Sequence, residues 1–220
     1  MIRLTAPPTC RSGTEPFGLR PADRLTRADV DAVRAHFAVA NRTRFLIQVP
    51  PGVEVEAGAL DPLRPLRGWS KLVHHLTAVP EVGAAFEIRR ATEDAARFAA
   101  TGCDAFGAPP LFAPLLAAPV GRPGWSHYLA LDAGRAVAIG AMYAAGDVAW
   151  LGVAATLATD RRRGAQQALL AARLRDARSL GLRAVYSEGD QDLPDRPGSS
   201  VRNMLRLGFD LLYHRENFGP

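Results

Sequence analysis

Apolar and polar residues alternate regularly in several stretches beyond residue 85. Phe86-Glu87-Ile88-Arg89 has the two-residue period of a half-buried strand. Three further strands are predicted over His127–Leu131, Ala136–Ala144 and Val148–Ala155. The links between these three are short and contain glycine, which is typical of hairpin turns. We therefore expect the three strands to be antiparallel neighbours.

Helical patterns flank these strands. Thr92 precedes two acidic residues and predicts the N-cap of a helix that runs to about Ala100. A second short helix is predicted over Leu111–Ala117. A longer helix is predicted after Asp160, with an apolar face and with charged residues mostly outside it. The apolar face consists of Leu169, Leu170, Ala172, Leu174 and Ala177, and the charged residues are Arg173, Arg175, Asp176 and Arg178.

The C-terminal part alternates between strand and helix. A short strand is predicted over Ala184–Tyr186, then a helix near Ser200–Leu207 that Gly208 ends, and a final strand over Phe209–His214. Strands followed by helix, strand, helix and strand predict a mixed, largely antiparallel central sheet flanked by helices. This is an α/β (α+β) architecture.

The N-terminal part has some likeness to this C-terminal pattern. Leu66–His74 resembles Leu207–His214, and at the same offset the helix candidate Ala28–Ala40 falls on the long helix. Two interpretations stay open: a partial repeat of the same fold, or coincidence between two amphipathic stretches. We predict that residues 1–85 form a partial repeat with a linker and that residues 86–220 form the main domain.

Composition narrows the class of protein. The chain has 220 residues, of which 48% are hydrophobic, enough for a sizeable core. Its apolar runs are shorter than the roughly 18 residues of a membrane span, so no membrane association is expected. The N-terminus lacks the apolar run of a signal peptide. The two cysteines, Cys10 and Cys103, suit neither a disulfide framework nor a metal cluster, so we expect a cytoplasmic protein without a metal site.

The formal net charge of +5 permits an anionic ligand. The arginines are scattered among acidic residues rather than gathered in one block, so nucleic acid is not the expected partner. A small polyanion fits the same charge.

One turn has the features of an anion site. The strand that ends in small residues near Thr156 leads through Arg161-Arg162-Arg163-Gly164 into the long helix. Such a turn presents unpaired backbone N–H groups at the positive end of the helix dipole. Gly164 has no side chain to keep a phosphate away from the backbone, and the three arginines deepen the positive potential.

Here the sequence resembles the GNAT superfamily of acyl-CoA-dependent N-acyltransferases. Its signature, Arg/Gln-x-x-Gly-x-Gly/Ala, lies between a strand and the following helix. This chain reads Arg161-Arg162-Arg163-Gly164-Ala165-Gln166, so Gln166 replaces the last small residue. The resemblance covers about Phe86 to Asn217 and includes the order of elements and the Leu207-Gly208-Phe209 ending of the last helix.

The resemblance implies how acetyl-CoA would be held. The strand around Ala155, Thr156 and Leu157 would splay from its neighbour and bind the pantetheine arm through its backbone. The amides of Arg162, Arg163, Gly164, Ala165, Gln166 and Gln167 would bind the pyrophosphate. The last helix would line the other side of CoA with Ser200 and Asn203, and helix capping by Ser199 or Ser200 is the alternative role.

Several residues are candidates for the catalytic acid and base. Many family members have a tyrosine as proton donor to the thiolate where this chain has Met204, which cannot donate. Other hydroxyl candidates are Tyr143, Tyr186, Ser187 and Tyr213. Glu188 is the candidate catalytic base because it follows a strand expected to end beside the acetyl group. His127 is an alternative base, and a solvated loop acid is the alternative role for Glu188.

These observations predict an acetyl-CoA-dependent N-acetyltransferase that acts on an amine of a small molecule or peptide. The alternative is a non-catalytic acyl-CoA-binding or sensor module. An acidic loop with Asp190, Asp192 and Asp195 favours a cationic acceptor. The oligomeric state stays open, with a homodimer as one arrangement.

Overall fold

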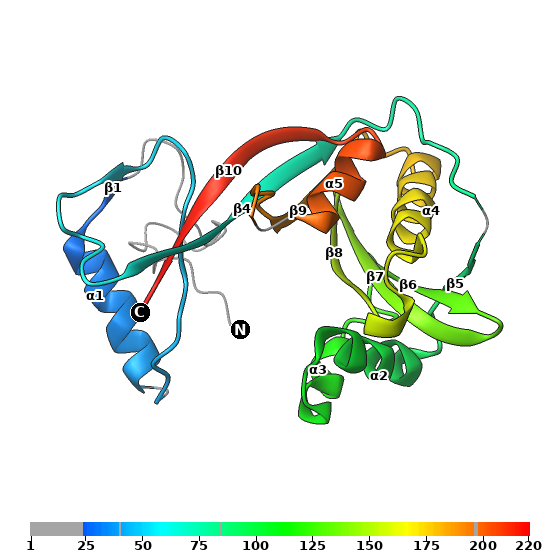
Figure 1. Cartoon of the computed structure of the whole chain (residues 1–220), viewed down its shortest axis with the longest axis horizontal. Helices are drawn as coiled ribbons and strands as arrows, with labels where there is room; N and C mark the ends of the chain where they lie inside the picture. Colours follow the sequence, from blue (N-terminus) through cyan, green and yellow to red (C-terminus); the bar gives the residue numbers. More distant parts are fainter. Residues whose placement is uncertain (1–23, 40, 84, 196–197) are drawn as a thin grey trace. The chain divides into compact units, whose positions relative to one another are not determined.

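A computed structural model describes residues 24–39, 41–83, 85–195 and 198–220 (Figure 1). The chain divides into two compact units. Leu72–Leu212 form the larger unit, and the residues up to Lys71 form the smaller one together with Tyr213–Pro220. Two long strands, β4 (Arg64–His74) and β10 (Asp210–Gly219), contribute residues to both units. Two segments far apart in the chain, residues 64–71 and Tyr213–Pro220, thus belong to the same unit.

The larger unit contains the elements that the sequence predicts beyond residue 85. The strand order of the mixed sheet is β2-β10-β4-β9-β8-β7-β6-β5, in which β2 (Ile47–Val49) belongs to the smaller unit. The elements that follow β4 in the chain are β5 (Glu87–Arg90), α2 (Ala95–Phe106), the 3-10 helix η1 (Pro110–Phe112), α3 (Ala113–Ala117), β6 (Trp125–Asp132), β7 (Arg135–Ala145), β8 (Val148–Thr156), the 3-10 helix η2 (Ala158–Asp160), α4 (Ala165–Ser179), β9 (Ala184–Asp190) and α5 (Ser199–Arg206).

The predicted hairpins are confirmed. β5, β6, β7 and β8 pair antiparallel in chain order. Gly134 and Gly146 have φ values of +80° and +59° in the two turns, a region that glycine enters without steric cost. The connection from β8 through α4 to β9 makes a parallel pair instead, because a helix crossover returns the chain in the same direction.

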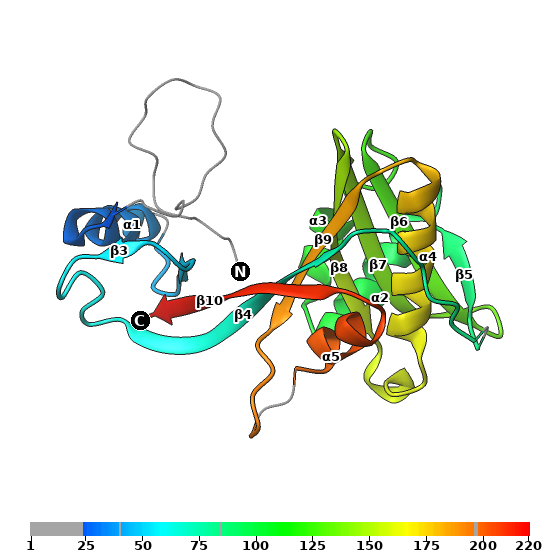
Figure 2. The same ribbon diagram turned by 90° about the horizontal axis from the view of Figure 1, so that it is seen from above.

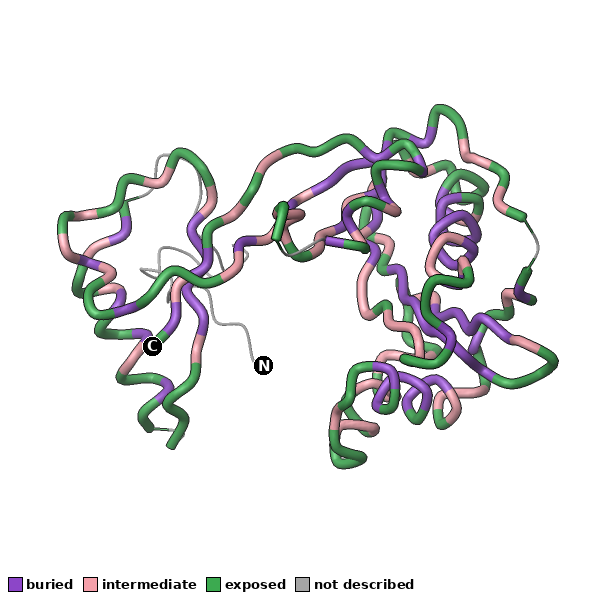
Figure 3. The backbone as a smooth tube through the Cα atoms, in the orientation of Figure 1, coloured by how far each residue is buried: buried purple, intermediate pink, exposed green. Residues whose placement is uncertain are grey.

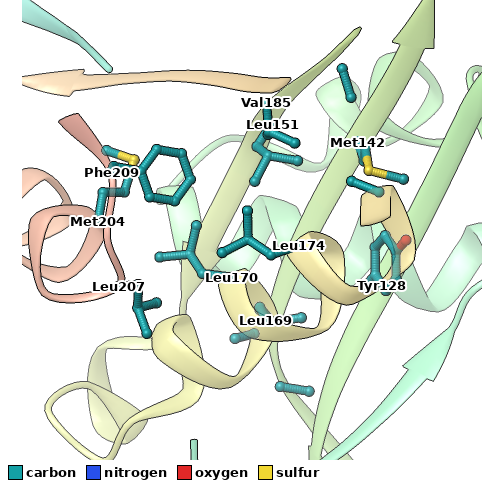
Figure 4. Close-up of a cluster of buried hydrophobic side chains, with 14 of the residues drawn as sticks. Tyr128, Met142, Leu151, Leu169, Leu170, Leu174, Val185, Met204, Leu207 and Phe209 are labelled. Atoms are coloured by element: carbon teal, nitrogen blue, oxygen red, sulfur yellow. The ribbon is translucent and has the colours of Figure 1, made fainter. Parts of the chain in front are cut away.

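The sheet carries a separate core on each face. Tyr128 and Ala130 of β6 belong to a cluster with Leu169 and Leu174 of α4 (Figure 4). Leu129 and Leu131, the alternate residues of the strand, pack with Phe98 of α2. Because successive strand residues point to opposite faces, α4 covers one face and α2 the other (Figure 2).

Helix α4 packs closely because its inner face is rich in alanine. Ala165, Ala168, Ala171, Ala172 and Ala177 are all buried, and Figure 3 shows the buried face of the helix against the sheet. Small side chains bring the helix axis near the strands, and the larger leucines fill the remaining space. The φ of +72° at Gly181 and the bond from Leu182 N to Ala177 O end the helix.

Arg173 departs from the predicted pattern of α4. Its side chain was expected mostly outside the apolar face, yet it is only 1% exposed. Its Nε donates to Leu169 O at 3.0 Å and its Nη1 donates to Ala141 O at 3.0 Å. Gly140 makes room for the guanidinium, since a Cβ there would lie 3.0 Å from Arg173 Cζ. The long side chain can be buried because it reaches backbone acceptors.

Helix α2 differs from the prediction at both ends. Its N-cap is Asp94 rather than Thr92, and it extends to Phe106 rather than Ala100. It passes through Gly102, where a Cβ would lie 2.9 Å from side-chain carbons of both Ile139 and Leu116. Close packing against β7 and α3 therefore overrides the low helix propensity of glycine.

The last two strands are longer than predicted. β9 continues from Tyr186 to Asp190, which places Glu188 inside the strand instead of after it. β10 continues from His214 to Gly219. The added positions are largely polar and do not alternate with apolar residues, so the sequence pattern does not predict them as strand. Pairing within the sheet extends both strands.

The smaller unit has its own core. Helix α1 (Arg27–Val39) begins with a reciprocal cap in which Thr26 N donates to Asp29 Oδ2 at 2.9 Å and Asp29 N donates to Thr26 Oγ1 at 3.3 Å. Its buried face packs against β2 (Ile47–Val49), which pairs antiparallel with β10. β1 (Arg24–Leu25) and β3 (Glu54–Val55) form a separate parallel pair.

The proposed repeat consists of a helix, a strand, a second helix and a final strand. Residues 50–63 contain β3 and turns and no helix, so the second helix has no counterpart in the smaller unit. The partial repeat and the division at residue 85 stay predictions. Cys103 is buried in α2, and Cys10 lies outside the described residues. In the part of the chain that the structure describes, no helix is both long and apolar enough to span a membrane.

Candidate functional site

Strands β8 and β9 are paired only over the first part of their length. Their parallel ladder runs from Val148↔Ala184 to Leu151↔Ser187. β8 then continues to Thr156 and β9 to Asp190 outside this ladder. The backbone edge of β8 that follows Leu151 is thus released from β9, as the predicted splay of this strand requires.

A β-bulge accompanies the separation. Ile139 pairs with Ala155 and Ala141 with Gly152, so Val153 and Ala154 on β8 stand opposite the single residue Gly140. Val153 has a φ of +47°, which is unusual for a β-branched residue. A bulge bends its strand and increases the local twist, so it directs β8 away from β9 at this point.

The turn after β8 leads directly into α4. Arg162 and Gly164 have positive φ values of 61° and 92°, and α4 begins at Ala165. The N-cap Gly164 has no side chain that could cap the helix. The first amides of α4 therefore lack a helical partner and, among the described residues, a capping side chain. Of the residues that the structure describes, a Cβ at Gly164 would meet Gln167 Oε1 alone, at 4.0 Å. The predicted pyrophosphate amides therefore lie at an open helix N-terminus.

A buried carboxylate anchors this turn. Asp160 is 2% exposed, and its Oδ1 accepts from Arg135 Nη2 and Arg163 Nη1, each at 2.8 Å. Thr159 Oγ1 donates to Asp160 Oδ2 at 2.8 Å. The bonds from Arg135 and Thr159 hold the pKa of Asp160 below its ordinary value, so the carboxylate stays ionised.

Arg163 also binds a second carboxylate, since its Nη2 lies 2.9 Å from Asp132 Oδ2. Its charge is therefore balanced by two acids and does not add fully to the field at the helix N-terminus. This corrects the expectation that all three arginines deepen the potential. Arg161 is tied differently, with its Nε donating to Thr156 O at 3.3 Å. Asp160 was not among the residues predicted from the sequence, although an acid directly before three arginines is a signal for such an anchor.

Gln166, the departure from the family signature, connects the two helices next to the turn. Its Nε2 donates to Ser200 Oγ at 2.9 Å, and its Oε1 accepts from Asn203 Nδ2 at 2.7 Å. The side chain of the unusual residue thus binds both predicted residues of α5. Gly198 rather than a serine is the N-cap of α5, and it has no side-chain hydrogen bond. The capping role considered for Ser200 is therefore wrong.

The candidate acid and base positions differ in burial. Met204 is 2% exposed in the core that Leu207 and Phe209 share, away from solvent (Figure 4). Glu188 is partly exposed in β9, directly after the last residue that pairs with β8. The structure therefore puts Glu188 at the point where the two strands separate.

Other candidates have structural contacts. Ser187 Oγ donates to Leu151 O at 3.0 Å and is buried. His127 is buried against Trp125 and Phe98, with ring centroids at 5.5 Å and 4.8 Å, and burial lowers its pKa. Asp192, from the acidic loop, accepts from Gly198 N at 2.7 Å and from Arg202 Nε at 2.7 Å. Asp192 therefore holds the loop against α5. Because its carboxylate is already paired with Arg202, it is a weaker argument for a cationic acceptor than the sequence alone indicates.

Comparisons with known proteins agree with this geometry. No protein-family model and no curated protein matches the sequence. Several solved structures match the fold. A GCN5-related N-acetyltransferase from Kribbella flavida is 21% identical at a TM-score of 0.63, over 90% of this chain and 78% of that chain.

Two further structures extend the comparison. A GCN5-related N-acetyltransferase from Sphaerobacter thermophilus is 18% identical at a TM-score of 0.67, over 88% of this chain and 65% of that chain. A tandem GNAT protein from the clavulanic acid biosynthesis pathway is 17% identical at a TM-score of 0.56, over 88% of this chain and 68% of that chain. At sequence identities this low, the matches show that the fold is shared. Together with the splayed β8 and β9 and the helix that starts after Gly164, they establish that this chain has the GNAT fold.

Proposed function

We propose that the protein is an acetyl-CoA-dependent N-acetyltransferase. The observation that carries this proposal is the separation of β8 from β9 next to the uncapped start of α4. A released strand edge suits the amide groups of pantetheine, and an open helix N-terminus suits a pyrophosphate. Their adjacency in a GNAT fold supports one ligand that uses both.

The residues present fit this ligand. Backbone groups of Ala155, Thr156 and Leu157 would bind the pantetheine arm, and the amides from Arg162 to Gln167 would bind the pyrophosphate. Ser200 and Asn203 on α5 would line the opposite side, where Gln166 already binds both. The cosubstrate supplies an acetyl group activated as a thioester.

The reaction joins the acceptor nitrogen to the acetyl carbon and breaks the carbon–sulfur bond. We assign Glu188 as the base that takes the proton from the amine, directly or through a water. Met204 has no proton to give, so the leaving thiolate takes its proton from water or from another hydroxyl. The products are an N-acetylated amine and the free thiol of CoA.

A pair of glycine variants tests the binding part. Gly164 and Gly181 have positive φ values of 92° and 72° and lie at opposite ends of α4. Glutamate at either position costs about 1 to 2 kcal/mol in the left-handed region. Only Gly164→Glu places a negative charge at the proposed pyrophosphate amides, which makes Gly181→Glu a matched control.

Thermal denaturation measures the outcome. Acetyl-CoA at about 100 times its Kd should stabilise the protein by about 2.7 kcal/mol, which raises Tm by roughly 5 to 10 °C. Gly181→Glu should keep this increase and Gly164→Glu should lose it. An unchanged Tm of the unmodified protein in millimolar acetyl-CoA would refute the proposal.

A non-catalytic acyl-CoA-binding module is the second candidate. The burial of Met204 in the core favours it, because this position then contributes packing and no proton donor. Release of free thiol from acetyl-CoA in the presence of an amine panel separates the two. A binding module would show the thermal shift without thiol release.

A further inference from the structure

Four aromatic side chains form a row across four strands of the larger unit. Trp125 of β6 pairs with Tyr143 of β7, Tyr143 with Trp150 of β8, and Trp150 with Tyr186 of β9. Directly paired residues project from the same face of a sheet. The aromatic row, as we call these four residues, therefore lies on one face, and at its β9 end it reaches the proposed site.

The ring of Trp125 contacts those of Tyr143 and Trp150, and none of the four rings of the row is fully buried. The centroid of Trp125 lies 5.0 Å from that of Tyr143 and 6.3 Å from that of Trp150, whose ring is perpendicular to it. Tyr143 is 39% exposed, and the other three are partly exposed. On the same face, Leu129 and Ile139 are fully buried in the core that includes Phe98 of α2. On this face of the sheet, the side chains under α2 are therefore buried, whereas those of the aromatic row are partly accessible to solvent.

Trp150 extends along β8 toward the bulge. A Cβ on Gly152 would lie only 1.9 Å from Trp150 Cη2, so the indole ring covers this glycine. Gly152 is the last residue before the bulge at which β8 leaves β9. The missing side chain lets the ring lie flat against the strand, where it presents an aromatic surface beside the point of separation.

Glu188 belongs to the same face. It follows Tyr186 by two residues in β9, and the side-chain period of a strand is two. The distance between the two positions along the strand is roughly 7 Å. That distance is comparable to the length of a phenyl ring with a short alkyl arm. A planar group on the aromatic row would therefore bring an attached amine near the proposed base.

We propose that the aromatic row binds the acceptor and selects primary amines that carry a flat aromatic group. This inference rests on the proposed N-acetyltransferase function. Offset-stacked and edge-to-face contacts favour an aromatic ring over an aliphatic ring of similar size. A linear polyamine has no flat apolar surface to stack and would leave the row exposed to water.

Matched amines test the selection. The panel consists of 2-phenylethylamine, its saturated analogue 2-cyclohexylethylamine, and putrescine, each assayed by thiol release from acetyl-CoA. We expect kcat/KM for 2-phenylethylamine to exceed that for the cyclohexyl analogue by about fivefold and that for putrescine by at least about tenfold. Equal values for all three amines, or a preference for putrescine, would overturn the inference.

Tryptophan variants locate the selection. Trp150→Leu should lower kcat/KM for 2-phenylethylamine about tenfold, mainly through KM, and Trp150→Phe should restore part of it. Trp69→Leu is the matched control, because Trp69 belongs to the smaller unit, where it lies near Arg215. The Tm increase with acetyl-CoA shows that each variant is folded. A Trp150→Leu enzyme with unchanged KM would contradict the proposed contact.

A binding measurement separates failure of this inference from failure of the proposed function. Saturation-transfer NMR with 2-phenylethylamine, without acetyl-CoA, should give a signal that Trp150→Leu reduces. If this signal is present but acetyl-CoA does not bind, the aromatic site stands and the proposed function fails. If acetyl-CoA binds and thiol is released with other amines, but 2-phenylethylamine gives no signal, only the aromatic site fails.

Discussion

Arg173 is a charged residue in the middle of a core. Burial lowers the pKa of its guanidinium to about 10, so it stays charged near neutral pH. The two carbonyl acceptors, Leu169 O and Ala141 O, compensate only partly for the lost hydration. The shift from the ordinary value of 12.5 corresponds to a cost on the order of 3 kcal/mol. The charge of Arg173 therefore carries a desolvation cost within the larger unit.

Replacing this charge should stabilise the protein. Arg173→Met keeps a long unbranched side chain and removes the desolvation cost, so we expect a gain of about 1 to 3 kcal/mol. Urea denaturation followed by circular dichroism measures it. Arg175→Met, at an exposed position of the same helix, should stay within about 0.5 kcal/mol of the unmodified protein. A loss of stability in Arg173→Met would mean that its hydrogen bonds outweigh its desolvation.

His127 predicts a dependence of stability on pH. Burial lowers its pKa in the folded state, so below about pH 6.5 the unfolded chain binds a proton that the folded chain does not. The free energy of unfolding should therefore fall as pH is lowered from 7 to 5. Its slope from this residue is at most about 1.4 kcal/mol per pH unit.

The matching variant is His127→Phe, which keeps a ring between Trp125 and Phe98. It should reduce the slope measured by urea denaturation at a series of pH values. His74, whose pKa is also lowered by burial, should keep contributing in this variant. An identical slope in His127→Phe and the unmodified protein would contradict the assignment.

At the scale of secondary-structure elements, Gln166 links α4 to α5. Its two side-chain hydrogen bonds cross between the helices that flank the proposed cosubstrate site. A glycine or alanine, as in the family signature, could not make them. Where the signature has a small residue, this chain thus has a glutamine whose side chain connects α4 to α5.

Gln166→Ala should cost about 1 to 3 kcal/mol of stability, because each of the two lost hydrogen bonds contributes about 0.5 to 1.5 kcal/mol. Thermal denaturation measures the loss. The backbone amide remains, so the Tm increase with acetyl-CoA should persist. The adjacent Gln167→Ala serves as a control, because the side chain of Gln167 makes no hydrogen bond within the described part of the chain. Its effect should be below about 0.5 kcal/mol. Equal losses in both variants would argue against the link.

Local signals in the sequence predict some elements better than others. The hairpin turns and the glycine end of α4 could be predicted because Gly134, Gly146 and Gly181 adopt positive φ through their own chemistry. The extension of α2 through Gly102 depends on its contact with Ile139, which no local pattern reveals. The same holds for the strand position of Glu188 and the burial of Arg173.

The candidate site divides in the same way. The turn at Gly164 could be predicted from its residues because a backbone site needs only glycine and a helix start. The anchoring of Arg163 by Asp132 and the bonds of Gln166 to α5 join residues far apart in the chain. The aromatic row likewise depends on the register of four strands, which the sequence does not specify.

At the scale of the whole molecule, the C-terminal strand completes the N-terminal unit. Asn217 is buried, donates to Arg67 O at 2.6 Å and accepts from Gln48 Nε2 at 3.1 Å. Phe218 packs against the core of α1 and β2. Residues at the end of the sequence thus stabilise elements near its beginning.

Deletion of residues 213–220 should therefore unfold the smaller unit first. Loss of Phe218 and of the partner of β2 should cost that unit about 3 kcal/mol or more. Limited proteolysis followed by mass spectrometry should show cleavage within residues 41–63 at least about ten times faster, while Leu72–Leu212 stays protected. Phe218→Ala should give a smaller effect in the same region. Protection of residues 41–63 after the deletion would show that the unit does not need β10.

This arrangement orders the biosynthesis of the protein. The residues up to Lys71 are translated before Leu72–Leu212, but their unit also includes Tyr213–Pro220. At about 5 to 20 residues per second, translation of the intervening segment takes roughly 7 to 30 s. During this interval α1 and β2 are present without β10, and their apolar faces are available to chaperones and proteases. The larger unit, although encoded later, can complete its own core before the smaller one.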